Sequence, residues 1–299
     1  MKKAVKLIVF FMILFLFMLC ITAKIYEISF GYRSNITEDE TRKTLSNYPN
    51  LTREKEEILT KEKKKIIGYF YNKKDNQPLI IFSQGIGSRA LDYIHEINYF
   101  VLKGYTVFSF DNIGCGESEG ETIRGLSQSV VDLDCVLTHI ENSEEFKKSK
   151  IFLYGHSWGG FAVCAVNNFS HKVAGVVERS GFNKSTKMIY KFLEENKNKV
   201  VAKIVSPFVG IYEFIKFGRY ANITATDGIN LASCPVMIMH STDDTVVPYD
   251  VSIVSNKDKI KNRRLVIKEY SEKNHFITSD YNKIDYDILG EINDFFSLC

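Results

Sequence analysis

A serine between two glycines is the strongest chemical signal in this sequence. Ser157 stands in the run Tyr154-Gly155-His156-Ser157-Trp158-Gly159, directly after the apolar run Ile151–Leu153. A strand that turns tightly into a helix lifts such a serine hydroxyl above the sheet, and the flanking glycines relieve the crowding that side chains would cause. Small apolar residues at 161–166 continue the pattern as a helix. The spacing therefore predicts a nucleophilic hydroxyl at Ser157.

A serine hydroxyl needs a base, and chain order selects one histidine. Where a nucleophilic serine lies in such a turn between a strand and a helix, the acid and then the histidine follow the serine along the chain. His275 lies in a polar loop beyond the apolar run 235–239 and beyond a second strand pattern at 264–270. The other five precede the serine, lie in its turn, follow it too soon or end a strand: His95, His139, His156, His171 and His240. We therefore expect His275 to be the base.

The acid is expected where the apolar run 235–239 enters a polar turn. Asp243 and Asp244 both lie in this turn, which would place a carboxylate at the C-terminal edge of a sheet. Such a carboxylate holds the imidazole in the useful tautomer and stabilises its protonated form. The turn by itself leaves both aspartates open.

These motifs together resemble the serine hydrolases of the α/β-hydrolase fold. The resemblance covers roughly residues 60–299 and is greatest to the branch of monoacylglycerol lipases and serine aminopeptidases of the S33 type. Leu79–Gly87 is similar to the family's strand and oxyanion loop, and Phe108–Gly120 is similar to its Asp-x-Arg-Gly-x-Gly-x-Ser-x-Gly loop. The family's spacing selects Asp244 as the acid, with Asp243 as the alternative.

The resemblance also implies an oxyanion hole. The backbone N–H groups of Ile86 and Trp158 would form it. Gln84 stands where the family usually has histidine, Asn112 where it has arginine, and Ser241 where it has glycine. None of these changes removes a catalytic group. Backbone donors survive side-chain changes, so Gln84 bears on the geometry of the loop rather than on its chemistry.

Composition fits one large domain without a cofactor. The chain has 299 residues, of which 45% are hydrophobic, and this is enough for one large α/β domain and an anchor. The net charge of +3, from 39 basic and 36 acidic residues, is too balanced to indicate nucleic acid. The six cysteines show no CxxC spacing, and no metal-ligand cluster is visible. We expect neither a cofactor nor a disulfide framework.

The N-terminus predicts a membrane segment. Three lysines at positions 2, 3 and 6 precede the uncharged run Leu7–Ala23, which as a helix would span about 25 Å. We expect residues 1–25 to form an uncleaved signal anchor with the catalytic domain outside the cytoplasm; secretion after cleavage at Ala23 is the alternative. Residues 26–59 are predicted to be a polar stalk with an irregular start to the domain.

Strand and helix patterns alternate over most of the remaining chain. Apolar runs near 66–71, 79–83, 106–110, 151–154, 173–177, 236–239 and 265–268 predict strands. Helical patterns near 89–102, 127–142, 158–168, 248–258 and 283–297 separate most of them. The alternation predicts an α/β fold with a mainly parallel sheet covered by helices on both faces. A helical insertion at about 182–232 interrupts it and, by the resemblance, would be a lid.

The expected function is hydrolysis of carboxylic esters through an acyl-enzyme. The substrate would be an acylglycerol or another small acyl ester, and the N-terminal helix would bring the enzyme to a membrane. A peptidase of the S33 type shares the same triad, as does an acyltransferase or thioesterase. A non-catalytic binding protein on the same scaffold is the remaining class, and such proteins typically lose a triad member.

Overall fold

An eight-stranded sheet forms the centre of the computed structural model, which describes residues 2–35, 41, 44–196, 198–280 and 283–299. Its strand order is β1-β2-β4-β3-β5-β6-β7-β8. In chain order the strands are β1 Arg53–Leu59, β2 Lys65–Tyr71, β3 Leu79–Ser83, β4 Thr106–Phe110, β5 Ile151–His156, β6 Gly175–Arg179, β7 Val236–Ser241 and β8 Leu265–Tyr270.

Most of the sheet is parallel and buried. β2 pairs antiparallel with both β1 and β4, whereas all pairs from β4 to β8 are parallel. Every residue of β3, β4, β5, β6 and β7 is buried. Both faces of these strands are covered, which explains why they are continuous apolar runs in the sequence rather than alternating ones.

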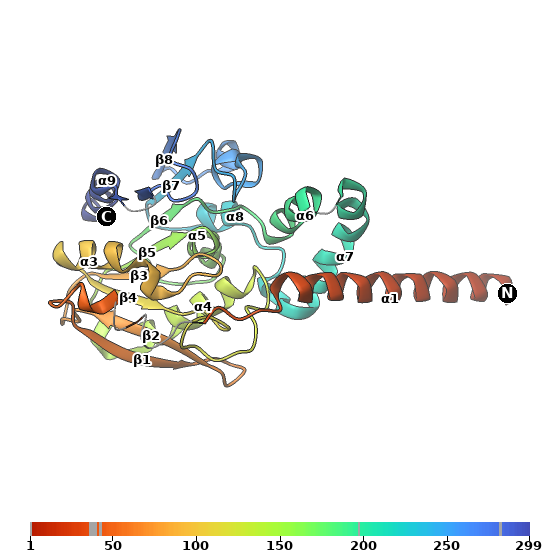
Figure 1. The fold of residues 1–299 in the computed structure, drawn as a ribbon, viewed down its shortest axis with the longest axis horizontal. Coiled ribbons are helices and arrows are strands. Elements are labelled where there is room, and N and C mark those ends of the chain that lie inside the picture. Colours follow the sequence, from red (N-terminus) through yellow and green to blue (C-terminus); the bar gives the residue numbers. More distant parts are fainter. Residues whose placement is uncertain (1, 36–40, 42–43, 197, 281–282) are drawn as a thin grey trace.

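Helices cover the two faces of the sheet (Figure 1). Along β3, Ile80 and Phe82 belong to one core cluster, while Leu79 and Ile81 belong to the other. The first cluster includes α3 Ile94–Leu102 and α9 Tyr286–Ser297, and the second includes α4 Gln128–Asn142, α5 Trp158–Ala165 and α8 Ala225–Leu231. The predicted α/β architecture is confirmed.

Short 3₁₀ helices complete the domain. They are η1 Ala90–Tyr93, η2 Glu144–Phe146, η3 Val166–Asn168, η4 Gly218–Tyr220, η5 Tyr249–Val251 and η6 Val254–Lys259. Two short strands, β9 Ser279–Asp280 and β10 Lys283–Ile284, pair antiparallel. The sequence predicted one helix near 248–258, where the structure has η5 and η6. The Ser252 side chain donates to the Tyr249 carbonyl and accepts from the Ser255 amide, and this local bonding competes with a continuous α-helix.

Two further helices lie between β6 and β7, away from the sheet. They are α6 Ser185–Asn196 and α7 Lys199–Phe217, and α8 follows them before β7. The side chain of Asn198 caps α7 by accepting from the amide of Val200 at 2.7 Å. This helical segment occupies the predicted insertion, whose role as a lid stays a prediction.

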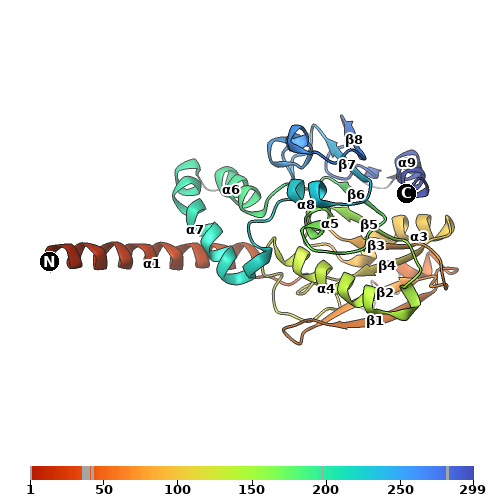
Figure 2. The same ribbon diagram turned by 180° about the vertical axis from the view of Figure 1, so that it is seen from behind.

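The N-terminal helix α1, Lys2–Phe30, projects from the domain (Figure 2). Its length and apolar composition would allow it to cross a membrane. Thr22, Tyr26 and Phe30 near its end are buried against the domain. Of the predicted stalk at 26–59, residues 36–40, 42 and 43 lie outside the described residues, and β1 occupies its last part. The predicted domain boundaries stay predictions.

Candidate active site

The turn between β5 and α5 places Ser157 at the C-terminal edge of the sheet. Ser157 has φ 56° and ψ −111°, a backbone conformation that residues with a side chain rarely adopt. Its amide donates to the carbonyl of Arg179 at 2.9 Å, and its carbonyl accepts from the amide of Phe161 at 3.0 Å. These bonds fix the strained turn between β6 and the first turn of α5.

Steric contacts explain the two glycines that flank Ser157. A Cβ atom on Gly155 would lie 2.3 Å from the carbonyl oxygen of Gly159. A Cβ atom on Gly159 would lie 2.0 Å from the carbonyl oxygen of Ser83, at the end of β3. Both distances are far below a van der Waals contact. The serine turn can therefore form only when both positions lack a side chain.

His275 and Asp244 form a buried pair beside this turn. His275 Nδ1 lies 2.8 Å from Asp244 Oδ2, and each residue is 5% exposed. The other carboxylate oxygen of Asp244 accepts from the amides of Val246 and Val247 at 2.8 and 2.9 Å. With a carboxylate as acceptor, Nδ1 carries the proton and Nε2 is left as the basic atom. The contact has the geometry that orients a catalytic imidazole.

The neighbouring aspartate has a different environment. Asp243 accepts from the hydroxyl of Ser241 at 2.5 Å and from the amide of Asn274 at 3.3 Å. It therefore ties the end of β7 to the loop that carries His275. The structure gives the imidazole contact to Asp244 and leaves Asp243 at the surface of the turn.

His240 lies beneath this pair at the end of β7. It is fully buried, and its Nε2 lies 3.1 Å from the carbonyl oxygen of Val247. Burial lowers the pKa of His240, which favours the neutral ring. A carbonyl only accepts, so Nε2–H donates to it. His240 therefore supports the loop that holds Asp244 and adds no positive charge next to it.

The loop that carries His275, which we call the base loop, packs against the ends of β5 and β6. The hydroxyl of Ser180 donates to the carbonyl of His275 at 2.8 Å, and the rings of His156 and His275 have centroids 4.7 Å apart. These contacts place His275 next to the turn that carries Ser157. Among the described residues, no hydrogen bond joins the Ser157 hydroxyl to the imidazole; such bonds are often long without substrate and tighten when it binds.

The loop after β3 is the one predicted to carry the oxyanion hole, and we call it the oxyanion loop. The side-chain amide of Gln84 donates to the carbonyl of Ser88 at 2.9 Å and so closes the loop. The amide of Gly85 donates to the hydroxyl of Tyr93 at 3.0 Å. The backbone amides of Ile86 and Trp158 donate no hydrogen bond to a backbone carbonyl in the turns and loops that the structure describes. Both amides are therefore available to a ligand oxygen.

Tyr93 and His156 connect the oxyanion loop to the base loop. The Tyr93 hydroxyl lies 2.8 Å from His156 Nδ1, and His156 Nε2 lies 3.3 Å from the carbonyl oxygen of His275. Burial lowers the pKa of His156 and keeps the ring neutral, so Nε2–H donates to this carbonyl and Nδ1 accepts from Tyr93. No sequence pattern indicated this role, because Tyr93 precedes the serine by more than sixty positions.

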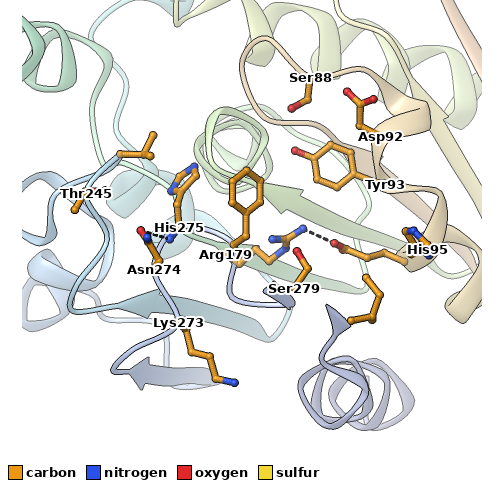
Figure 3. A pocket seen from close by; sticks show the side chains of 14 residues that line it. Ser88, Asp92, Tyr93, His95, Arg179, Thr245, Lys273, Asn274, His275 and Ser279 are labelled. Carbon is orange, nitrogen blue, oxygen red and sulfur yellow. Dashed lines mark hydrogen bonds and ion pairs between the residues drawn. The ribbon is translucent and has the colours of Figure 1, made fainter. Parts of the chain in front are cut away.

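A cavity of about 620 Å³ opens beside His275 (Figure 3). Tyr93 and Ser88 lie on one side of it, and His275 and Asn274 on the other. Ser157 is not among its lining residues, so the cavity approaches the site from the side of the base. A substrate that reaches Ser157 could place its leaving group or acyl group in this space.

A buried ion pair forms one wall of the cavity. Arg179 Nη2 lies 2.6 Å from Glu96 Oε1, and both side chains are buried. The same carboxylate accepts from the hydroxyls of Tyr154 at 2.7 Å and Thr278 at 2.9 Å. The carboxylate is thus committed to partners within the fold. No local sequence pattern predicted this network, because its members come from four distant elements.

The segment after α1 packs over the loops around the site. The guanidinium of Arg33 donates to the carbonyls of Gly116, Ser118 and Gly120 at 2.6 to 2.8 Å. The hydroxyl of Ser34 donates to the carbonyl of Gly87, in the oxyanion loop, at 2.7 Å. The sequence predicted a polar stalk in this region. The structure makes it a support of the oxyanion loop.

The first part of the domain is similar to a known protein family. Residues 74–214, just under half of the chain, match the family model described as serine aminopeptidase, S33. Solved structures extend the likeness to most of the chain. The Pyrococcus furiosus esterase Pf2001 has 19% sequence identity and a TM-score of 0.66, covering 89% of this chain and 97% of its own. This chain has the α/β-hydrolase fold.

Another solved α/β-hydrolase neighbour is a peptidase. The Pyrococcus horikoshii acylaminoacyl peptidase has 12% identity and a TM-score of 0.62, covering 86% of this chain and 43% of its own. At these identities the likeness shows the fold alone. The α/β-hydrolase fold thus accommodates both ester and peptide hydrolysis among its neighbours.

Sequence relatives include lipases and a membrane protein. The lysophosphatidylserine lipase ABHD12 of Danio rerio is 27% identical over 187 residues, which is 59% of this chain and 46% of the relative. An uncharacterized membrane protein of Saccharomyces cerevisiae is 33% identical over 104 residues, which is 31% of this chain and 36% of the relative. The chain thus matches less than half the length of these relatives.

Proposed function

We propose that this protein is a serine hydrolase that cleaves carboxylic esters through Ser157, His275 and Asp244. The observation that supports this most directly is the 2.8 Å contact between His275 Nδ1 and Asp244, next to a strained serine turn. A carboxylate, an imidazole and a hydroxyl in this order form a proton-transfer chain that activates a serine. The free amides of Ile86 and Trp158 complete the set.

The reaction proceeds in two steps. His275 Nε2 takes the hydroxyl proton while Ser157 Oγ attacks the ester carbonyl carbon, and the amides of Ile86 and Trp158 donate to the resulting oxyanion. The C–O bond of the ester then breaks, and the alcohol leaves with the proton from His275. Water, deprotonated by His275, attacks the acyl-enzyme, releases the carboxylic acid and restores Ser157.

The substrate we propose is an ester of a single acyl chain, such as an acylglycerol. The apolar helix α1 and the similarity to the lysophosphatidylserine lipase ABHD12 support a lipid ester. A peptidase is the second candidate, favoured by the description of the matching family model. It would need a free carboxylate for the substrate amine, and the cavity carboxylates of Glu96 and Asp92 are already paired with Arg179 and Arg89. Acyltransferase or thioesterase chemistry would share the acyl-enzyme and differ in the acceptor.

Membrane attachment through α1 is part of the proposal. The lysines at 2, 3 and 6 before the apolar run favour a cytoplasmic N-terminus and an extracytoplasmic catalytic domain. Burial of Tyr26 and Phe30 shows that the end of α1 belongs to the packed domain. Cleavage after Ala23, the alternative, would release a secreted enzyme that keeps both residues.

Turnover of esters tests the proposed function. Full-length protein in detergent is assayed with p-nitrophenyl esters, with a long-chain monoacylglycerol and with an aminoacyl arylamide. Ester hydrolysis should fall by several orders of magnitude in Ser157→Ala and in His275→Ala, since the two side chains act as one unit. Undiminished ester turnover in Ser157→Ala would contradict the proposal. Faster cleavage of the arylamide than of any ester would favour the peptidase instead.

A further inference from the structure

The helix α7 is apolar on opposite faces. One face is buried against the protein through the apolar side chains of Ala202, Val205, Val209 and Phe217, together with the carboxylate of Glu213, which accepts hydrogen bonds from the hydroxyls of Tyr26 and Ser185. The opposite face carries exposed apolar side chains, and we call it the α7 outer face: Val200, Ile204, Ile211, Phe214 and Ile215. Phe214 and Ile215 are 61% and 65% exposed.

The sequence spacing places the α7 outer face on one side of the helix, with the exposed Pro207 between its two halves. Its members follow each other at intervals of four, seven, three and one residues, which places them on the same side of an α-helix with 3.6 residues per turn. The side chains of the α7 outer face are exposed, so none of the described residues covers this face. A contiguous exposed apolar stripe of this kind marks an interaction surface.

α7 packs against α1 through residues that lie beside the α7 outer face. The rings of Phe15 on α1 and Phe208 on α7 have centroids 5.6 Å apart, and those of Tyr26 and Tyr212 are 5.1 Å apart. At the base of the two helices, Lys216 pairs with Glu27 at 2.8 Å. The two helices therefore form one unit, and both ribbon views place α7 beside α1 (Figures 1 and 2).

The contact with Phe15 sets the depth of α7. Phe15 is exposed and lies in the middle of the uncharged run Leu7–Ala23, eight residues or about 12 Å of helix before its end. If α1 crosses a bilayer, the ring of Phe208 lies below the surface of the leaflet that faces the catalytic domain. The lysines at 199 and 203 have long side chains that can reach the headgroups from there.

We propose that the α7 outer face is a bilayer-contact surface, buried in the hydrocarbon of the leaflet that borders the catalytic domain. The occupant is lipid, because the face lies beside the exposed apolar surface of α1, for which a membrane is the matching environment. This contact goes beyond the proposed function, because it concerns how the domain lies on a membrane. It does not depend on which reaction the domain catalyses. It would hold the domain at a fixed height and orientation against the leaflet.

Depth-dependent quenching tests this contact. The full chain is reconstituted in phosphatidylcholine vesicles whose acyl chains carry bromine, which quenches nearby tryptophan. The native chain has one tryptophan, the buried Trp158, and wild-type protein gives its contribution. Ile204→Trp and Phe214→Trp place a probe on the α7 outer face, and Leu102→Trp places one on α3, where Leu102 is 76% exposed.

The two outcomes are distinct. We expect brominated lipid to quench the added tryptophan at least twofold at positions 204 and 214, and to leave the one at 102 near the wild-type level. Equal, weak quenching at all three positions would overturn the proposal. If tryptophans at 204 and 214 were not quenched and the protein formed crosslinked pairs, the α7 outer face would instead contact a second copy of the chain. That result would also overturn the proposal.

Activity gives a separate readout that does not depend on quenching. Ile211→Glu combined with Ile215→Glu should lower hydrolysis of vesicle-borne monoacylglycerol at least tenfold and leave hydrolysis of a soluble short ester unchanged. If the two substitutions changed the hydrolysis of both substrates equally, the bilayer contact would be contradicted. Labelling of Ser157 by a fluorophosphonate in the same variant keeps this result apart from a failure of the catalytic proposal.

Discussion

The Nδ1 atom of His275 lies 2.8 Å from a carboxylate oxygen of Asp244, and both residues are buried. The pair joins the loop after β7 to the loop after β8, two connections at the same edge of the sheet. In a parallel sheet, the C-terminal ends of the strands meet at this edge, where the turn after β5 also places Ser157. The pairing therefore depends on the topology of the sheet.

Changing the acid should impair catalysis without unfolding the protein. Asp244→Asn keeps the size of the side chain but no longer fixes the tautomer of His275, and by analogy with serine proteases kcat should fall about 10⁴-fold. Asp243→Asn is the matched control, since Asp243 contacts Ser241 and Asn274 rather than the imidazole. Ester turnover of the two variants, with circular dichroism for folding, checks this. A larger loss in Asp243→Asn would reverse the assignment.

Tyr93 is expected to position the oxyanion loop. Tyr93→Phe removes the acceptor of the Gly85 amide and the donor to His156 Nδ1, which frees the loop that carries Ile86. Loss of an oxyanion donor costs about 10²- to 10³-fold in kcat, so a loosened loop should cost less, on the order of tenfold.

The readout for Tyr93 is the split between kcat and KM. Tyr99→Phe, a partly buried position on α3 that has no contact with the oxyanion loop, is the control and should leave both constants unchanged. A fall in kcat at constant KM supports a role in the transition state. A fall in thermal stability with unchanged kcat would instead make Tyr93 a structural residue only.

The buried Arg179–Glu96 pair should dominate the stability of the cavity wall. Glu96→Gln leaves the guanidinium buried without its counter-charge, and breaking such a pair costs about 3–5 kcal/mol of unfolding free energy. Glu57→Gln removes a surface partner of Lys65 and should leave the midpoint unchanged. Urea unfolding followed by circular dichroism compares the variants. Equal midpoints for both would show that the buried pair contributes little.

Glu178 should make stability fall as pH rises. Burial raises its pKa to about 8 from an ordinary value near 4.5, so the folded protein keeps a proton that the unfolded chain has lost between these values. The unfolded state then binds fewer protons, and the free energy of unfolding decreases with pH by at most about 1.4 kcal/mol per unit.

A neutral isostere at Glu178 tests this dependence. Glu178→Gln cannot titrate, while its side-chain oxygen can still accept from the amide of Gly181 as the carboxylate does at 2.9 Å. The variant should therefore gain stability relative to wild type as the pH rises from 5 to 8. Urea unfolding at several pH values measures the difference. A constant difference would mean that Glu178 is ionised in the folded protein.

Local patterns predicted the strands and the serine turn well. Apolar runs such as Leu79–Ser83 mark buried parallel strands, and Gly155 and Gly159 are explained by contacts that a Cβ atom would create. Chain order selected His275 and the family's spacing selected Asp244, and the structure joins these two residues. These features are encoded over short stretches of sequence.

The missed features all depend on contacts between distant segments. Ser34 bonds to the carbonyl of Gly87, and Tyr93 bonds to His156, but neither residue stands in a pattern that shows its partner. The contact of Phe15 with Phe208 is of the same kind, because two apolar runs reveal nothing of their relative placement. Tertiary packing decides these features, and a single sequence does not display it.

Labelling of one hydroxyl tests the central claim most directly. The folded, full-length protein is treated with a fluorophosphonate, and peptide mass spectrometry locates the adduct. We expect a single phosphonylated residue, Ser157, with labelling that is slowed strongly in Asp244→Asn and little in Asp243→Asn. Folded protein that stays unlabelled at Ser157, or that carries its adduct on another serine, would contradict the proposed catalytic site.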